Sequence, residues 1–319
     1  MLQFLSMTAV VIINPVAGGR ARLAPERRVA IAREALRQAR VDGDVRLTEC
    51  CGHGRDLARA AVASGCDVVI AWGGDGTINE VACALIGQPA ALGIVRAGSG
   101  NGFARELGIP TRPELALAGA LTGSERVIDT GEIDGRRFLN IAGIGFDAAM
   151  ALRFDRLGTE RRGAFRYTGA VVRSVFTYRA LQYSIRADGE PLQFEALLLA
   201  VANLPQYGSN AVIAPRAVPF DGLLDLVVVG QRGALGRVGL VPRLFDRSIH
   251  KAPNVTFRPV RDLVIECSEP MPYHVDGEPV QGGTRLEARV LPRSLRVRGI
   301  ASSRWPTFVD TPAAGILDT

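Results

Sequence analysis

Apolar residues follow two different periods along the first part of the chain. Short continuous runs rich in valine, isoleucine and alanine alternate with segments whose apolar residues recur roughly every three or four positions. The runs predict buried strands at Thr8–Ile13, Asp44–Thr48, Asp67–Trp72 and Ala91–Val95. The periodic segments predict helices at Pro25–Arg40, Gly54–Ser64, Thr77–Ile86, Asn101–Leu107 and Pro113–Leu121. Strands that alternate with helices predict a doubly wound, mostly parallel α/β domain whose sheet is covered on both faces.

The pattern changes after the last of these helices, where strand-like runs follow one another with short turns between them. Asp134-Gly135, Asp188-Gly189 and Asp276-Gly277 have the composition of tight hairpin turns. Two helical inserts, Gly163–Ala180 and Gly233–Ile249, interrupt the series. The predicted strands are Arg126–Ile133, Arg137–Ile141, Leu181–Asp188, Gln193–Asn203, Leu224–Val229, Asn254–Cys267, Met271–Val275, Thr284–Leu291 and Leu295–Gly299. This half therefore predicts a C-terminal antiparallel β-sandwich-like domain.

The two patterns predict two domains and a tail. Residues 1–128 are expected to form the α/β domain, and residues 129–299 the β-rich domain, whose last strand is free to return toward the first domain. Residues 300–319 form a tail without a clear pattern. A chain of 319 residues is long enough to bury sizeable cores and usually forms two domains.

The composition is that of a folded protein with a basic balance of charge. Apolar residues make up 47% of the chain and charged residues 22%, and the formal net charge is +6. This balance is compatible with nucleic acid, anionic lipid or phosphorylated ligands. Five cysteines show no metal-ligand spacing, so we expect reduced, mostly buried thiols in a cytoplasmic protein. No apolar stretch approaches the roughly 18 residues of a membrane-spanning helix, so any membrane contact is expected to be peripheral.

The segment Trp72–Glu80 carries the clearest chemical signal. An apolar strand stops at Gly73-Gly74, Asp75-Gly76-Thr77 follows, and a helical pattern then begins. Glycines let backbone N–H groups approach a ligand, and the start of a helix adds unpaired N–H groups with a partial positive charge. The combination predicts an anion cradle suited to phosphate. A carboxylate at this place repels phosphate unless it binds a metal or takes a proton, and both roles are open for Asp75.

Two further glycine-rich loops follow strands of the same predicted sheet. They span Asn14–Arg20 and Ala97–Ala104. Taken alone, the first is an ordinary turn, and the second departs from a dinucleotide fingerprint because Phe103 occupies the position of a small residue. Loops after parallel strands gather at one sheet edge, so their convergence with the cradle predicts a ligand site. A Walker A loop is excluded because its spacing is missing and Lys251 is the only lysine of the chain.

Two acidic turns in the second half have alternative interpretations. Asp221 and Asp225 surround a glycine, which is typical of a turn before a strand or of a cation loop. Asp276 and Glu278 form either an ordinary hairpin turn or a base with a metal-orienting neighbour. The three histidines form no catalytic or zinc pattern and are expected in surface or capping roles: His53, His250 and His274.

The ordered set of these motifs resembles the diacylglycerol kinase catalytic-domain family, which includes bacterial lipid kinases and the sphingosine and ceramide kinases. The glycine turn after the third strand is shared with NAD kinases, whereas the full series is more specific and spans nearly the whole chain. Gly102 stands where many bacterial members carry an aspartate, which removes one acid from the implied metal network and weakens the case for diacylglycerol as the substrate. The motifs are Asn14–Gly19, Gly73–Thr77, Gly98–Asn101, Phe220–Asp225 and Asp276–Glu278.

The resemblance implies that ATP, with Mg²⁺, and a lipid meet in the cleft between the domains, where the γ-phosphoryl group passes to a lipid hydroxyl. Asp276 is implied as the proton acceptor with Glu278 beside it, and Asp75 as a residue that arranges catalytic Mg²⁺ or, in some relatives, acts as the base. A structural Mg²⁺ is assigned to Asp221 with the carbonyls of Val218 and Leu223. The implied nucleotide site consists of Asn14, Thr48, Gly73, Gly74, Asp75, Gly76, Thr77, Ile78, Asn79 and Ser99.

The resemblance also implies a partner: a lipid alcohol, of diacylglycerol or sphingoid type, at a membrane surface rather than nucleic acid. A homodimer is left open. Arginine-rich amphipathic segments within 161–179 and 233–251 are either helices packed on the β-rich domain or membrane-facing surfaces. Two alternatives remain, a NAD kinase and a non-catalytic protein that binds nucleotide or lipid. The lipid-kinase motifs disfavour the first, and the intact acids disfavour the second.

Overall fold

The computed structural model describes most of the 319 residues. The described residues are 7–18, 23–98, 100–146, 148–149, 152, 178–208, 210–230 and 239–301. The insert predicted at Gly163–Ala180 and the tail predicted at 300–319 lie almost entirely outside this part of the chain, and the insert predicted at Gly233–Ile249 lies partly outside it.

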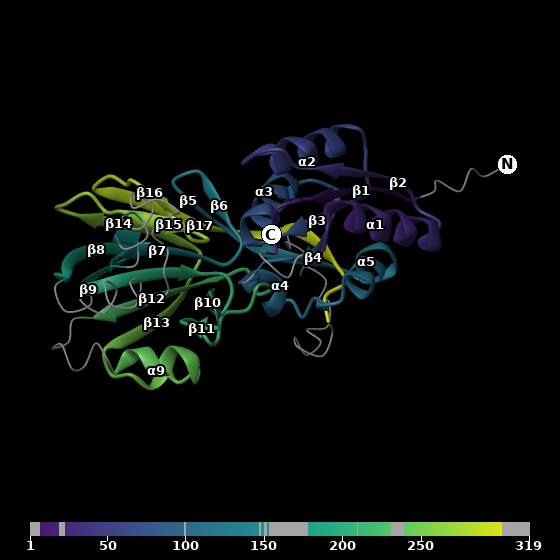
Figure 1. Ribbon diagram of the computed structural model, residues 1–319. Coiled ribbons are helices and arrows are strands. Elements are labelled where there is room, and N and C mark those ends of the chain that lie inside the picture. The colour runs from purple at the N-terminus through teal and green to yellow at the C-terminus, as the bar shows by residue number, and fades with distance from the viewer. Residues whose placement is uncertain are drawn as a thin grey trace, which may run out of the picture.

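The N-terminal part is a parallel sheet with helices on both faces (Figure 1). Its strands are β1 (Thr8–Ile13), β2 (Asp42–Leu47), β3 (Val68–Gly73) and β4 (Ala91–Arg96). Its helices are α1 (Pro25–Ala39), α2 (His53–Ala63), α3 (Asp75–Leu85), α4 (Gly102–Glu106) and α5 (Pro113–Thr122). The strands pair in the order β2-β1-β3-β4, all parallel, with α2 and α3 packed together on one face and α1 and α5 on the other. The predicted doubly wound α/β domain is confirmed.

Local sequence explains these elements. Every residue of β3 is buried, as expected for a parallel strand covered on both faces. α1 and α5 both begin at a proline, whose fixed φ suits the first turn of a helix. Gly93 lets α5 approach the sheet closely, because a Cβ there would lie 2.6 Å from the Cβ of Ala120. The packing brings the C-terminal ends of the strands, and the loops that follow them, to one edge of the sheet.

The C-terminal part is mostly antiparallel β (Figure 1). Its longer strands are β5 (Glu125–Ile133), β8 (Leu181–Ala187), β9 (Glu190–Ala202), β12 (Leu224–Gly230), β13 (Val255–Val260), β14 (Asp262–Cys267) and β17 (Arg285–Arg298). Its shorter strands are β6 (Arg136–Phe138), β7 (Ile141–Gly145), β10 (Gln206–Gly208), β11 (Ala211–Val212), β15 (Tyr273–Val275) and β16 (Glu278–Val280). A short helix, α9 (Leu240–Phe245), and a 3₁₀ turn, η3 (Ile249–Lys251), precede β13.

The long strand β9 joins two sheet layers into a sandwich. Its first half pairs with β8, which continues through β14 to β17 and β5. Its second half lies between β7 and β12, and this layer continues to β15 and β16 on one side and to β13 on the other. The buried side chains between the layers include Tyr183, Ile185, Leu199, Leu226 and Ile265. The predicted β-sandwich-like domain is confirmed.

Two strands connect the halves of the molecule. β5 leaves α5 and pairs along β17, and the end of β17 reaches β4 with one parallel pair, Val297 with Leu92. Leu295 and Val297 are fully buried in the core of the α/β domain. Residue 128, where the domain boundary was expected, falls inside β5. The loops of the parallel sheet therefore face the sandwich across a junction made of paired strands.

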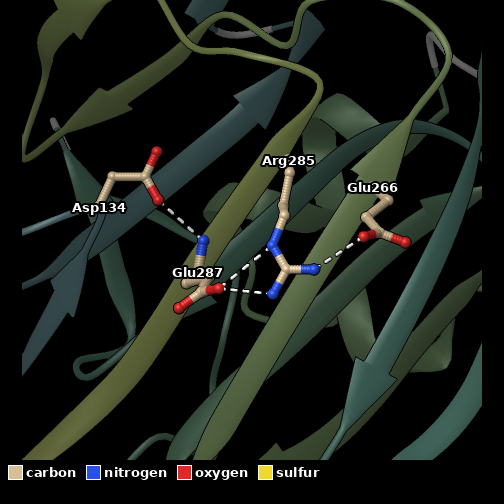
Figure 2. Close-up of polar contacts among 4 residues, drawn as sticks. All are labelled: Asp134, Glu266, Arg285 and Glu287. Atoms are coloured by element: carbon tan, nitrogen blue, oxygen red, sulfur yellow. Dashed lines mark hydrogen bonds and ion pairs between the residues drawn. The ribbon is translucent and has the colours of Figure 1, made fainter.

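Three of the hairpins in the sandwich turn through Asp-Gly pairs whose two residues both have positive φ: Asp134-Gly135, Asp188-Gly189 and Asp276-Gly277. This is the backbone of a type I′ turn. In the first hairpin the Asp134 carboxylate accepts the Glu287 N–H at 2.8 Å, which ties the turn to β17 (Figure 2). In the second, Asp188 accepts the N–H groups of Arg261 and Asp262, each at 2.8 Å. The predicted turns are confirmed. Each of the three aspartate carboxylates also accepts at least one backbone N–H from another segment of the chain.

Exposed ion pairs lie beside the hydrogen bond between Asp134 and the backbone of Glu287 (Figure 2). Arg285 on β17 reaches Glu266 on the neighbouring strand β14 at 2.9 Å and Glu287 at 2.6 Å (Figure 2). These side chains are about half exposed, so each pair contributes little to stability.

Some strand limits differ from expectation for identifiable reasons. Asn254–Cys267 is not one strand but two, because the chain turns at Arg261, where Asp188 binds the backbone. Conversely, Thr284–Leu291 and Leu295–Gly299 belong to the single strand β17, whose register shifts between Leu291 and Leu295. The expectation of mostly buried cysteines was wrong. All five thiols are free, but only Cys66 is buried.

Candidate functional site

The glycine-rich loops of the α/β domain meet at the C-terminal edge of its sheet. Together they line an open cavity of about 450 Å³. The loop after β1 contributes Asn14, the turn after β3 contributes Gly74 and Gly76, and the loop after β4 contributes Gly98. Ala17, Gly18 and Thr77 complete the lining. The predicted convergence of three loops is confirmed.

Backbone geometry makes this cavity a cradle for an anion. α3 begins at Asp75, and its N-cap residue Gly74 provides no side chain to cap the helix, so first-turn N–H groups point toward the cavity with the positive end of the helix dipole. The Asn14 side chain donates to the Thr77 hydroxyl at 2.9 Å and holds the first loop against the helix. A Cβ on Gly98 would lie 2.8 Å from the Cα of Gly74, so these two loops touch through bare backbone.

Asp75 faces away from the cradle toward a second cavity. One carboxylate oxygen, Oδ2, accepts the backbone N–H of Asn101 at 2.7 Å. The other, Oδ1, is buried and has no hydrogen-bond partner among the described residues. A buried carboxylate oxygen without a donor is costly, and a cation bound there would satisfy it. The donor chemistry of Asp75 therefore fits Mg²⁺, which prefers carboxylate oxygen.

The second cavity, of about 180 Å³, lies between the two halves of the molecule. We call it the cleft cavity. Asp75 lies at its α/β side and Asp276 at its sandwich side. The remaining lining residues are Ile78, Asn79, Gly100, Gly102, Phe103, Leu139, Asn140, Ile141, Tyr207 and His274.

Asp276 is held by four hydrogen bonds. Its Oδ1 accepts the backbone N–H groups of Asn140 at 2.9 Å and Ile141 at 3.0 Å. Its Oδ2 accepts the backbone N–H of Leu139 at 2.7 Å and the side-chain amide of Asn79 at 2.8 Å. Asn79 belongs to α3, so this last bond joins the two domains across the cleft cavity. Burial raises the pKa of Asp276 above its ordinary value, while the three backbone N–H groups oppose the rise.

A tyrosine–histidine pair, which sequence reasoning missed, completes the sandwich side of the cavity. His274 is buried at 5% exposure and its Nε2 lies 2.8 Å from the Tyr207 hydroxyl. The surface role expected for His274 was wrong, whereas its Nδ1 does cap the following turn by accepting the N–H of Gly277 at 3.3 Å. A weak signal was available, because His274 lies only two positions before Asp276, at the end of the strand that leads into the Asp276-Gly277 turn. No comparable signal pointed to Tyr207.

The predicted metal loop forms a concentration of carboxylates at the sandwich edge. Asp221 accepts the Leu223 N–H at 3.0 Å, and the buried Asp129 accepts the N–H groups of Gly222 and Arg293. Burial raises the pKa of Asp225 to about 6, and the charge of Asp221 adds to the rise. A cation bound near Asp221 and Asp225 would offset the repulsion between their negative charges. In the part of the chain that the structure describes, no three acidic, histidine or cysteine side chains converge as ligands, so a cation here would depend on backbone oxygens.

The other predicted residues are placed as follows. Gly73 and Ile78 lie in the β3–α3 segment, and a Cβ on Gly73 would lie 2.4 Å from the Cβ of Thr77. Thr48 is buried beyond the end of β2, outside the lining of both cavities. Glu278 is exposed on β16 and is not among the residues that line the cleft cavity. Ser99 lies outside the described residues.

Comparison with known proteins bears on both halves of the chain. Residues 8–133 match the diacylglycerol kinase catalytic domain, and residues 140–299 match the YegS C-terminal NAD kinase beta sandwich-like domain. A probable lipid kinase YegS-like of Pseudomonas aeruginosa is 35% identical over 289 residues, which cover 87% of this chain and 91% of that protein. A probable lipid kinase YegS-like of Klebsiella pneumoniae is 31% identical, with 89% and 94% covered.

Solved structures agree on the fold. A putative diacylglycerol kinase from Bacillus anthracis superposes with a TM-score of 0.75 at 22% identity, with 91% of this chain and 94% of that chain covered. The order of motifs, the two matched domains and the relatives of similar length agree with one another. The chain therefore belongs to the family of YegS-like lipid kinases, which carry a diacylglycerol kinase catalytic domain.

Proposed function

We propose that this protein transfers the γ-phosphoryl group of ATP, with Mg²⁺, to the hydroxyl of a lipid alcohol. One observation carries the proposal. The cleft cavity has the orphaned Asp75 oxygen on one side and the hydrogen-bonded Asp276 carboxylate on the other. Gly74, Gly76 and Thr77, at the start of α3, line the phosphate cradle next to it. Phosphoryl transfer needs this combination of anion binding, metal binding and a proton acceptor.

The cradle supports the binding of the donor. First-turn N–H groups of α3 and the backbone of Gly98 would bind phosphate oxygens, while Asn14 and Thr77 hold the loops in place. Mg²⁺ bound to Asp75 would neutralise charge that develops on the phosphoryl oxygens. The protein needs no loop lysine for this chemistry, since backbone dipoles and a metal ion provide the positive charge.

Asp276 is the proposed proton acceptor. The hydroxyl oxygen of the lipid forms the new bond to the γ-phosphorus, the bond from that phosphorus to the bridging oxygen breaks to leave ADP, and the hydroxyl proton passes to Asp276. A carboxylate offers about four lone-pair sites, and all four are occupied by Leu139, Asn140, Ile141 and Asn79. The lipid hydroxyl would therefore displace the Asn79 amide, the one donor that belongs to a side chain.

The acceptor side is proposed to work at a membrane surface. No helix among the described residues is long and apolar enough to cross a bilayer. We propose peripheral contact from a cytoplasmic protein, with diacylglycerol-type or sphingoid-type alcohols as the acceptor class.

A panel assay tests the proposal. Purified protein is incubated with Mg²⁺ and ATP labelled at the γ-phosphate, in separate reactions with detergent-dispersed diacylglycerol, monoacylglycerol, sphingosine, ceramide and NAD. Label is expected in at least one lipid and not in NAD, and omission of Mg²⁺ should abolish it. Label in NAD alone would replace the proposal with the NAD kinase alternative. Nucleotide binding without label in any acceptor would indicate a non-catalytic relative.

A further inference from the structure

Tyr207 and His274 form a hydrogen-bonded pair in the lining of the cleft cavity. Their rings meet edge to face with centroids 5.4 Å apart, and the Tyr207 hydroxyl lies 2.8 Å from His274 Nε2. His274 belongs to β15 of the sandwich, whereas Tyr207 belongs to β10, which among the described strands pairs with β11 alone. Neither side chain takes part in the proposed phosphoryl transfer.

The backbone fixes which atom of the pair donates. The N–H of Gly277 donates to Nδ1 of His274 at 3.3 Å. A neutral imidazole has one donor and one acceptor nitrogen, so Nδ1 is the acceptor and Nε2 carries the proton. Nε2–H then donates to the Tyr207 oxygen, and the Tyr207 O–H proton is directed elsewhere. Among the described residues no acceptor for this proton is found, while Tyr207 lines the cleft cavity.

We propose that Tyr207 is a positioning residue for the acceptor lipid, with its hydroxyl donating a hydrogen bond to a non-reacting carbonyl oxygen of the lipid, and that His274 fixes the direction of this bond. The inference rests on the proposed lipid kinase function. Its geometric basis is the chain of donors from Gly277 through His274 to Tyr207, which ends in the cavity that also contains Asp276.

The reacting hydroxyl is not the partner of Tyr207. That oxygen attacks phosphorus with a lone pair and gives its proton to Asp276, and a donor bound to it would withdraw the electron density that the attack requires. An ester carbonyl next to the alcohol carbon has lone pairs and no proton, which matches a site that only donates. The ammonium group of a sphingoid lipid in the same place can only donate hydrogen bonds, so it could not accept one from the Tyr207 hydroxyl.

The test compares two lipids in two proteins. The probes are dioctanoylglycerol and its diether analogue dioctylglycerol, which lacks both carbonyl oxygens. With the ester, Tyr207→Phe is expected to lower kcat/KM for the lipid by about 3- to 10-fold, the range for one neutral hydrogen bond, mainly through KM. With the ether, the wild-type protein should show a loss of the same size and Tyr207→Phe should cause no further loss. The KM for ATP should not change.

A matched control separates positioning from folding. Tyr273 is also buried, but it points to the opposite face of β15 and lies in the core of the sandwich. Tyr273→Phe also removes one hydroxyl and should leave kcat/KM for both lipids unchanged. Equal losses of Tyr207→Phe on ester and ether, or no loss on either, would overturn the inference. So would a wild-type protein that phosphorylates sphingosine but neither glycerolipid, a result that leaves the proposed function intact. Absence of label in any lipid would instead overturn the function itself.

Discussion

Replacing Asp276 by asparagine separates its chemical role from its structural role, in which it accepts the backbone N–H groups of residues 139–141. The amide keeps an acceptor oxygen for the N–H groups of Asn140 and Ile141, but its NH₂ faces the N–H of Leu139 and the Asn79 amide. Asn79 can turn its side chain and offer its oxygen, whereas the Leu139 N–H cannot move. One unmatched buried N–H costs about 1–3 kcal/mol, and relief from burying a charge offsets part of it. We expect a net loss of about 1–2 kcal/mol.

The effect on turnover should be much larger than this loss of stability. Removing a general base typically lowers kcat by about 10²- to 10⁴-fold, while ATP binding uses the cradle on the other domain. The assay therefore measures three quantities for Asp276→Asn: the urea midpoint, the Kd for ATP and kcat with the preferred lipid. We expect a small decrease in the urea midpoint and no change in the Kd for ATP. We expect kcat to fall by at least about 100-fold.

Asp188→Asn is the matched control, because Asp188 also opens an Asp-Gly turn with positive φ and accepts two backbone N–H groups through Oδ1. An asparagine there keeps the acceptor oxygen, so stability and kcat should stay close to wild type. If Asp276→Asn retains kcat within about threefold of the wild type, it is not the base. If Asp188→Asn lowers kcat as strongly, the loss reflects disturbed hairpins rather than lost chemistry.

Three further predictions concern the donor site and the metal loop. Gly98→Ala should weaken ATP binding with little effect on lipid KM, because its Cβ would lie 2.8 Å from the Cα of Gly74; unchanged Kd by calorimetry would contradict the cradle. Arg28→Met should lower both Tm and ATP affinity, because the buried guanidinium donates to the carbonyl of Asn14 at 2.8 Å and so holds the loop after β1. Unchanged ATP affinity would show that this loop does not depend on Arg28 to bind ATP. Because burial raises the pKa of Asp225 to about 6, its ionisation should cost the metal-free protein about 2 kcal/mol of stability as pH rises from about 4 to 7. Asp225→Asn should remove this part of the pH dependence of urea unfolding, and a variant whose profile matches the wild type would refute it.

The architecture of the α/β half follows from sequence pattern because its signals are local. Buried runs such as Val68–Gly73 alternate with helices, two of which, α1 and α5, start at a proline. The loops at the C-terminal edge of the sheet are recognisable in the sequence by their glycines. The Asp-Gly turns of the sandwich are equally local, since positive φ at both positions restricts the residue types.

The details of the cleft could not be predicted in the same way. The pairing of Asn79 with Asp276 and of Tyr207 with His274 joins segments that are far apart in the chain. Such contacts depend on how distant segments pack against one another. The periodicity of apolar residues and the spacing of motifs carry no information about that packing. The buried state of His274 was missed because a lone histidine on a short strand has the same appearance whether it faces solvent or a cavity.

The most direct test of lipid kinase activity is the transfer of labelled γ-phosphate from ATP to a lipid by the wild-type protein, with and without Mg²⁺. We expect a Mg²⁺-dependent phosphorylated lipid product that is lost in Asp276→Asn, while that variant still binds ATP. A wild-type protein that binds ATP yet labels no lipid in the panel, or that labels NAD instead, would contradict the proposed function.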